Sequence, residues 1–190
     1  MEEIYRKTRL FWHNLKRIDT PKIKTFGIDK IIIAGLEFNM FDSLGHPINL
    51  FVAANSLNES GFYYEKNNSE KMGFLLGKND SNFNGIISNL LNEASDLTYN
   101  MEEYKTLSRR PKLNFVNFFA VGRGGRFYKF LTYNEIFSPE HPYHNFFIYA
   151  KQLINEIRKL EYYRLMDERK KNKRERRNNK SSLNTSKARK

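Results

Sequence analysis

The chain has no cysteine and no long apolar run, and these absences exclude several classes of protein. Without cysteine, disulfides, thiolate metal sites and thiol nucleophiles are impossible, and nothing points to an oxidising compartment. No stretch approaches the roughly 20 apolar residues of a membrane-spanning helix. Residues 1–18 lack the uninterrupted apolar core of a secretory signal. We therefore expect a cytoplasmic or nuclear protein with no transmembrane segment.

Metal-binding and phosphate-binding motifs are also lacking. His141 and His144 are three residues apart, but Pro142 separates them, no third ligand is evident and no zinc-motif spacing is met. The stretch Gly122–Gly125 lacks the lysine and hydroxyl residue that follow in a phosphate-binding loop. We therefore predict no metal site and no cofactor.

Carboxylates occur among the expected strands, but their spacing is not distinctive. Asp29, Glu37, Asp42 and Glu65 lie on or beside β-prone runs, as the metal ligands of a nuclease would. Because no pattern singles them out, we assign no catalytic residue and expect a non-enzymatic protein. A metal-dependent nuclease that uses Asp29, Glu37 or Asp42 stays open as a second alternative.

Acidic residues almost disappear from the C-terminal end of the chain. Residues 169–190, the basic segment, contain eleven Lys or Arg and the single acid Glu175, a net charge of +10. The preceding 168 residues carry 22 basic and 20 acidic groups, so they are nearly neutral. The basicity of the chain is thus a property of one segment, which indicates an anionic partner.

Three stretches have helical periodicity. In residues 2–18 the apolar face is expected to comprise Ile4, Leu10 or Phe11, Leu15 and Ile18. Residues 82–94 place Phe83, Ile86, Ile87, Leu90 and Leu91 at the spacing of a helix docked by one face. Residues 143–168 repeat the pattern through Phe147, Ala150 or Lys151, Ile154 and Ile157. The basic segment beyond has no apolar stripe and favours either a helical extension or coil.

β-prone runs occupy much of the remaining chain. Residues 28–41, 48–54, 61–65 and 71–77 predict a meander of about four strands, since connections this short cannot make parallel crossovers. Gly35 is expected to mark a bulge in the first strand. Residues 112–133 predict a β-hairpin with a glycine-rich tip, central to the sheet.

These elements predict an α+β fold: an antiparallel β-meander and hairpin sheet of five or six strands, with N-terminal, middle and long C-terminal helices. An alternating βαβ pattern is absent, so a doubly wound sheet is excluded. We expect one domain at 1–168. The basic segment, 169–190, is expected to be a disordered or frayed-helix tail.

The hairpin allows two interpretations. Arg123 and Arg126 at its tip, beside Phe127, Tyr128 and Phe130, would suit phosphate contacts and base stacking. The favoured interpretation is that these aromatics alternate into the core and that the arginines keep the tip soluble.

Together these features predict a nucleic-acid-binding protein, for DNA or RNA, with the basic segment on the phosphates and the domain serving oligomerisation or a specific contact. The first alternative is a viral or mobile-element assembly protein that resembles a matrix protein and binds anionic membrane or genome. Homo-oligomers fit either hypothesis. The candidate contact residues are Lys170, Lys171, Lys173, Arg174, Arg176 and Arg177, with Arg123 and Arg126 as secondary contacts.

Overall fold

The structure is a computed structural model of the whole chain. It describes residues 2–14, 31–41, 44–66, 69–75, 81–105, 111–122 and 124–187. Within these ranges, the side chains of residues 2–4, 14, 66, 69–75, 81, 82, 161, 163, 165 and 173–187 are outside the description. The chain divides into a unit of residues Met1–Glu156 and a second unit of residues Ile157–Lys190.

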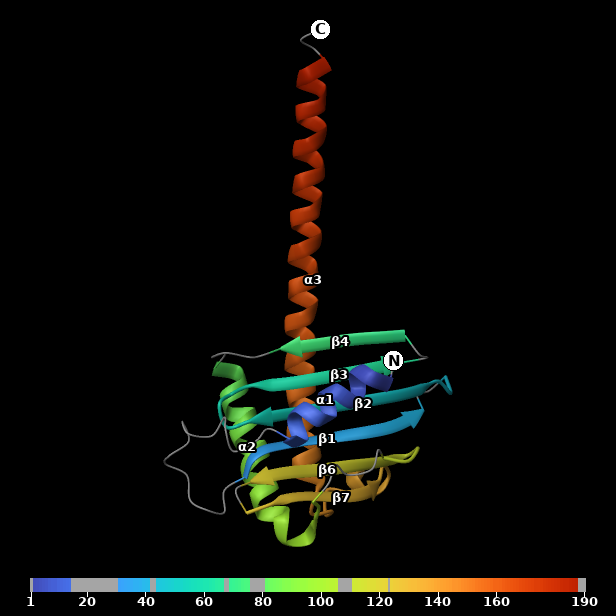
Figure 1. Ribbon diagram of the computed structural model, residues 1–190, viewed down its shortest axis with the longest axis vertical. Coiled ribbons are helices and arrows are strands. Elements are labelled where there is room, and N and C mark those ends of the chain that lie inside the picture. Colours follow the sequence, from blue (N-terminus) through green and yellow to red (C-terminus); the bar gives the residue numbers. More distant parts are fainter. Residues whose placement is uncertain are drawn as a thin grey trace. The chain divides into compact units, whose positions relative to one another are not determined.

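The first unit contains one antiparallel sheet, in the order β4-β3-β2-β1-β6-β7-β5 (Figure 1). The α+β class, the antiparallel sheet and the three helical regions are therefore confirmed. The separate basic tail stays a prediction. The strands are β1 (Ile31–Phe41), β2 (Pro47–Asn55), β3 (Ser60–Lys66), β4 (Ser69–Leu75), β5 (Glu102–Glu103), β6 (Phe115–Gly122) and β7 (Arg126–Thr132).

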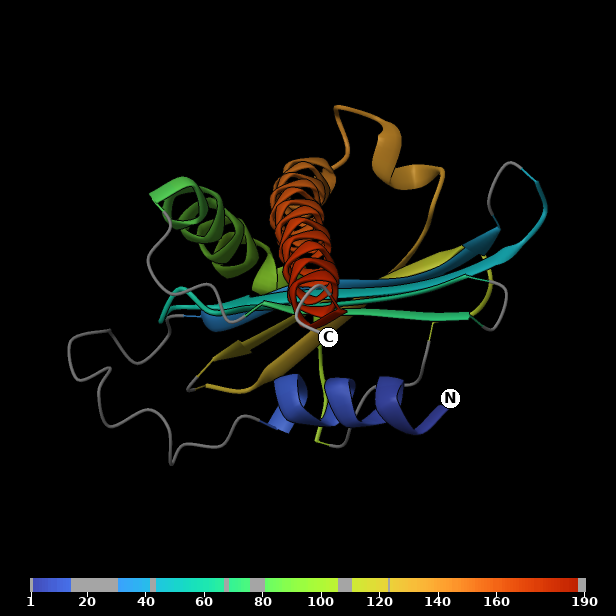
Figure 2. The ribbon, with the colours of Figure 1, turned by 90° about the horizontal axis from the view of Figure 1, so that it is seen from above.

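Helices cover both faces of this sheet. The helix α1 (Glu2–Asn14) lies on one face, whereas α2 (Ser81–Leu97) and the first turns of α3 (His144–Lys187) lie on the other (Figure 2). Short 3₁₀ turns, η2 (Thr98–Asn100) and η3 (Glu135–Phe137), follow α2 and β7. All three helices fall in regions where the sequence predicts helix.

The middle strand of the sheet is β1, which pairs with β2 on one side and β6 on the other. Its run of branched apolar residues is buried from Ile31 onwards, as a strand covered on both faces requires. The hairpin β6–β7 lies to one side of this strand, so the prediction that the hairpin is central was wrong. Its β6 strand joins the four-stranded meander to the rest of the sheet.

Gly35 is needed for packing and does not mark the bulge. The irregularity in the β1–β6 register lies between Ile31 and Ile33. A Cβ atom at Gly35 would come within 2.6 Å of the Phe119 ring and 2.3 Å of the Val52 carbonyl oxygen. Because backbone and a fully buried ring cannot both move away, only glycine fits here.

On the α2 face the prediction from periodicity is confirmed. The side chains of Phe83, Ile87, Leu90 and Leu91 are buried, and that of Ile86 is partly buried. In α3 the residues Phe147, Ala150 and Ile154 are buried as well, and Phe146 meets Phe118 of β6 at 5.1 Å between ring centroids. This face is an ordinary apolar helix–sheet core.

On the opposite face, the predicted apolar stripe of α1 was wrong. Phe11 is 53% exposed, and Leu10 is only partly buried. Leu15 and Ile18 lie outside the described residues, as does the side chain of Ile4. The buried side chains follow the i, i+3, i+4, i+7, i+8 spacing of a different stripe, which comprises Tyr5, Thr8, Arg9, Trp12 and His13.

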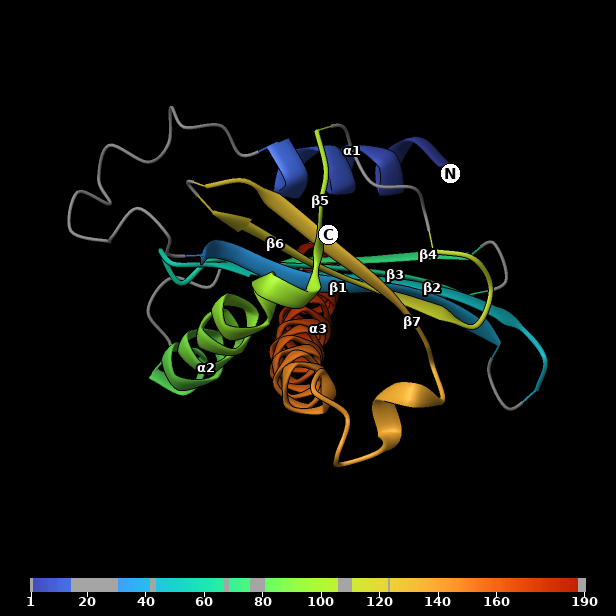
Figure 3. The same ribbon diagram turned by 90° about the horizontal axis from the view of Figure 1, so that it is seen from below.

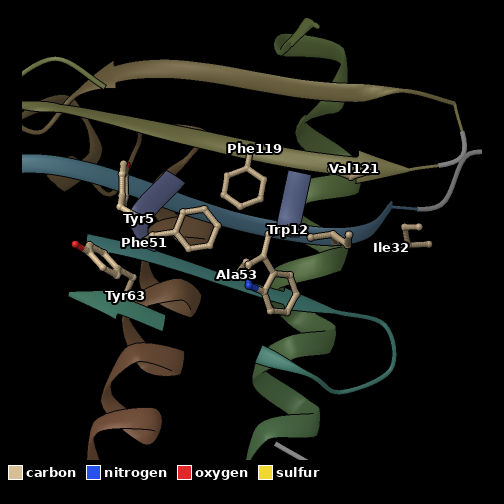
Figure 4. Close-up of a cluster of buried hydrophobic side chains, with 9 residues drawn as sticks. Tyr5, Trp12, Ile32, Phe51, Ala53, Tyr63, Phe119 and Val121 are labelled. Atoms are coloured by element: carbon tan, nitrogen blue, oxygen red, sulfur yellow. The ribbon is translucent and has the colours of Figure 1, made fainter. Parts of the chain in front are cut away.

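Two aromatic residues anchor this stripe. Figure 4 shows Tyr5 and Trp12 among side chains that rise from β1, β2, β3 and β6. The ring of Tyr5 lies 5.2 Å from that of Tyr63. The Trp12 indole lies so close over Gly61 that a Cβ atom there would come within 2.3 Å of it. Aromatic packing therefore positions α1, and polar residues fill the rest of its buried face.

Candidate functional site

The basic segment begins in a solvent-exposed part of α3. Lys170 and Lys171 are exposed. Lys170 lies 3.7 Å from Asp167 and Arg164 lies 3.5 Å from Glu168, and all four side chains are more than half exposed. Ion pairs of this kind are screened by water and exchange readily, so they leave the lysines able to meet a charged partner.

The helix continues through the rest of the segment to Lys187. At 100° per residue, positions 169, 173, 176, 180 and 187 fall on one side of it, over about 27 Å of helix axis. All five positions hold Lys or Arg. The helical backbone therefore brings five positions that are scattered in the sequence into one row.

The remaining candidate residues divide between this row and its opposite side. Positions 170 and 177 lie beside the row, whereas 171 and 174 fall nearer the side that holds Asp167, Glu168 and Glu175. Of the six candidate contact positions, the helix places 173 and 176 in the row and 171 on the opposite side, with 170, 174 and 177 in between.

The hairpin tip contributes less than its sequence indicates. Arg123 lies outside the described residues. Arg126 is partly exposed, and its guanidinium donates to the backbone oxygen of Lys105 at 3.4 Å. Gly122 N–H donates to the Gly125 oxygen at 2.9 Å and closes the turn.

The aromatic residues of β7 are not in the core, contrary to the favoured interpretation of this strand. Phe127, Tyr128 and Phe130 are all partly exposed, and Leu131 is the one buried residue of β7. The reason is position: β7 lies next to the edge of the sheet, where β5 pairs with it over only two residues.

A buried ion pair lies beneath α1. Glu37, on the middle strand, is fully buried, and one oxygen accepts from Arg9 Nε at 2.5 Å while the other accepts from the second guanidinium nitrogen at 2.7 Å. The Tyr5 hydroxyl and the Asn117 amide also donate to Glu37, at 2.8 and 2.6 Å. Burial alone would lower the pKa of Arg9, but the Glu37 carboxylate outweighs it, so that this pKa is raised.

His13 extends this polar layer. Its Nδ1 lies 2.5 Å from the Tyr104 hydroxyl, and its ring stacks 4.2 Å from that of Phe119. Burial, helped by the charges of Arg9 and Arg126, lowers the pKa of His13 to about 3, and burial raises that of Tyr104. Both groups are therefore neutral at pH 7 and shielded from water, as in a structural contact.

The other carboxylates and histidines that the structure describes do not assemble into a metal site. Among the described residues no three His, Asp or Glu side chains come together. Glu37 is occupied by its four donors, and Glu65 accepts from Tyr63 at 3.1 Å. Asp29 and Asp42 lie outside the description. His141 Nδ1 accepts from the Tyr143 N–H at 3.3 Å, a local turn contact.

A pocket of about 230 Å³ lies between β1 and α2. Its lining contains no charged residue, so it has no chemistry for an anion or for acid–base catalysis. The lining residues are Ile31, Ile32, Ser56, Asn58, Ile87, Ser88, Leu91 and Asn92.

Comparison with known proteins adds no functional information. No protein-family model matches the chain, and no curated protein or solved structure matches it either. None of the described helices combines the length and the apolar character needed to cross a membrane.

Proposed function

We propose that this is a non-enzymatic nucleic-acid-binding protein whose basic segment contacts the phosphates. One observation carries the proposal: most of the net charge lies in 22 residues, and the helix α3 continues through this segment to Lys187. Each phosphate that a Lys or Arg neutralises releases counterions, so a dense row of cations gives strong binding that depends on salt. Its site of action is the cytoplasm or nucleus, a proposal that the lack of cysteine supports.

The charge of the rest of the chain supports assigning the phosphate contacts to the basic segment. Arg9 is used internally by Glu37, and the 168 residues before the basic segment are nearly neutral. A neutral unit offers little general attraction to phosphate. We assign it oligomerisation or a more specific contact.

The test compares two variants that remove equal charge. The segment variant replaces Lys170, Lys171, Lys173, Arg174, Arg176 and Arg177 by glutamine, which preserves helix propensity. The matched control replaces six exposed cations outside the segment by glutamine: Lys7, Lys105, Lys112, Lys151, Arg158 and Lys159. Fluorescence anisotropy with labelled oligonucleotides measures affinity at constant salt.

The segment variant is expected to bind oligonucleotides at least about 100-fold more weakly than the wild type. The control variant is expected to lose much less affinity. Equal losses in both variants would contradict a role specific to the segment. A parallel arm uses anionic phosphatidylserine vesicles. Tight vesicle binding with no oligonucleotide binding would favour the assembly protein instead.

A further inference from the structure

The aromatic pair of β7, Tyr128 and Phe130, faces the same side of the sheet as α1. Tyr128 is opposite Phe119 and Phe130 is opposite Asn117 in the β6–β7 register. Directly paired residues share a face, and Phe119 and Asn117 contact His13 and Glu37 on the α1 side. Both rings of the pair are partly exposed, and their centroids lie 5.3 Å apart.

The pair is held in place from the core outwards. The Tyr104 ring packs edge-on against Tyr128 at 5.5 Å and itself contacts His13. The Tyr128 hydroxyl donates to Glu102 at 2.8 Å. Because contacts on two sides fix Tyr128, and Tyr128 in turn contacts Phe130, the two rings present an ordered surface to solvent.

Two cations lie on the same side of the sheet as this surface. Arg126 is two residues before Tyr128 on the same strand, so it shares its face. Arg6 is exposed and is seven residues before His13, which places it on the side of α1 that meets Phe119 and Tyr104. Figure 3 shows this edge of the sheet turned toward the viewer, with β7 in front of β6.

We propose that Tyr128 and Phe130 form a stacking platform for the unpaired bases of a single-stranded nucleic acid, with Arg126 and Arg6 beside the phosphates. This rests on the proposed function, since the basic segment supplies the general phosphate attraction. Aromatic rings stack on any exposed base, whereas the bases of a duplex stack on one another and are unavailable. The platform therefore selects single strands over duplexes.

The experiment removes the rings while keeping the strand apolar. The platform variant is Tyr128→Leu with Phe130→Leu. Phe127→Leu is the matched control, because Phe127 is equally a partly exposed aromatic of β7 but lies on the other face, opposite Ala120. The probes are a single-stranded oligothymidylate, an abasic strand with the same number of phosphates, and a duplex of the same length.

The platform variant is expected to bind oligothymidylate about tenfold more weakly per lost stacking contact, with no change for the abasic strand. The Phe127→Leu control is expected to bind like the wild type. Equal wild-type affinity for the abasic strand and oligothymidylate, or an unchanged affinity of the platform variant, would overturn the proposal. If the double variant does not fold, Phe130→Leu alone serves, since Phe130 lies farther from Tyr104 along the strand.

The segment variant separates this proposal from the function beneath it. If the segment variant loses all binding while the platform variant keeps the wild-type affinity, the platform is overturned and the proposed function stands. If the segment variant still prefers oligothymidylate to the abasic strand, the platform is supported. If the segment variant binds oligothymidylate as tightly as the wild type does, the role of the basic segment is overturned.

Discussion

The first and last helices of the chain use their charged residues in opposite ways. In α1 the side chain of Arg9 is 8% exposed and is enclosed with Glu37, Tyr5 and Asn117. In α3 the side chains of Lys170 and Arg164 are 68% and 62% exposed and form only loose ion pairs. The same residue types therefore hold the fold together in one helix and remain available for binding in the other.

This contrast shows that a count of charges is informative only once burial is known. An arginine that is buried against a carboxylate has exchanged water for fixed partners, so removing one partner is costly. An exposed lysine has kept its water and loses little when its neighbour is removed. The predictions below test each side of this contrast.

The largest effect is expected at the buried ion pair. Arg9→Met retains much of the side-chain volume but leaves Glu37 buried without its cation, so it should lower the free energy of unfolding by about 3–5 kcal/mol. Chemical denaturation monitored by circular dichroism measures this change. The exposed neighbour Arg6→Met is the control and should change stability by less than about 0.5 kcal/mol.

A second change should rescue the first. Arg9→Met combined with Glu37→Gln removes both charges and is expected to recover part of the loss. Equal effects of Arg9→Met and Arg6→Met, or a double variant less stable than Arg9→Met, would contradict the importance of the pair.

An intermediate effect is expected from His13 as the pH falls. Its pKa is about 3 in the folded protein and 6.5 unfolded, so the unfolded chain binds the proton first. The neutral His13 ring therefore makes its full contribution to the free energy of unfolding above pH 6.5. As the pH falls towards 3, the free energy of unfolding decreases by up to about 1.4 kcal/mol per pH unit.

Comparing unfolding at pH 6.5 and pH 5 measures this slope. His13→Asn should reduce the pH dependence of the free energy of unfolding by about 1.6 kcal/mol over that interval. A wild-type slope that survives in His13→Asn would show that His13 is not buried as a neutral ring.

The smallest effect is expected at the surface pairs of α3. Glu168→Gln removes the partner of Arg164, and because both side chains are more than half exposed, stability should change by less than about 0.5 kcal/mol. Thermal unfolding measures it against the wild type. A decrease in stability of more than about 1 kcal/mol in Glu168→Gln would mean that the Arg164–Glu168 ion pair stabilises the fold, as the Arg9–Glu37 pair does.

Elements whose buried face is wholly apolar were predictable from the sequence. The spacing of Phe83, Ile87, Leu90 and Leu91 predicts both α2 and its buried face, and the structure confirms them. Short connections between β-prone runs predict the antiparallel meander, which is observed as β1 to β4. In both, one local pattern contains all the information needed.

The face of α1 could not be predicted because its partners are distant in the sequence. Arg9 and His13 are buried only because Glu37 and Tyr104 meet them, 28 and 91 residues away. An apolar pattern alone favours Leu10 or Phe11, but Leu10 is partly exposed and Phe11 is about half exposed. The exposure of Tyr128 and Phe130 likewise follows from the place of β7 near a sheet edge, which no local pattern encodes.

The salt dependence of nucleic-acid affinity is the most direct test of whether the basic segment binds phosphate. The slope of log affinity against log salt counts the phosphates neutralised, at about 0.9 per contact on duplex DNA. The segment variant, with its six glutamines, is expected to lower the magnitude of this slope by up to about 5, and the six-residue control variant by less than about 1. Identical slopes for the wild type and the segment variant would contradict the account.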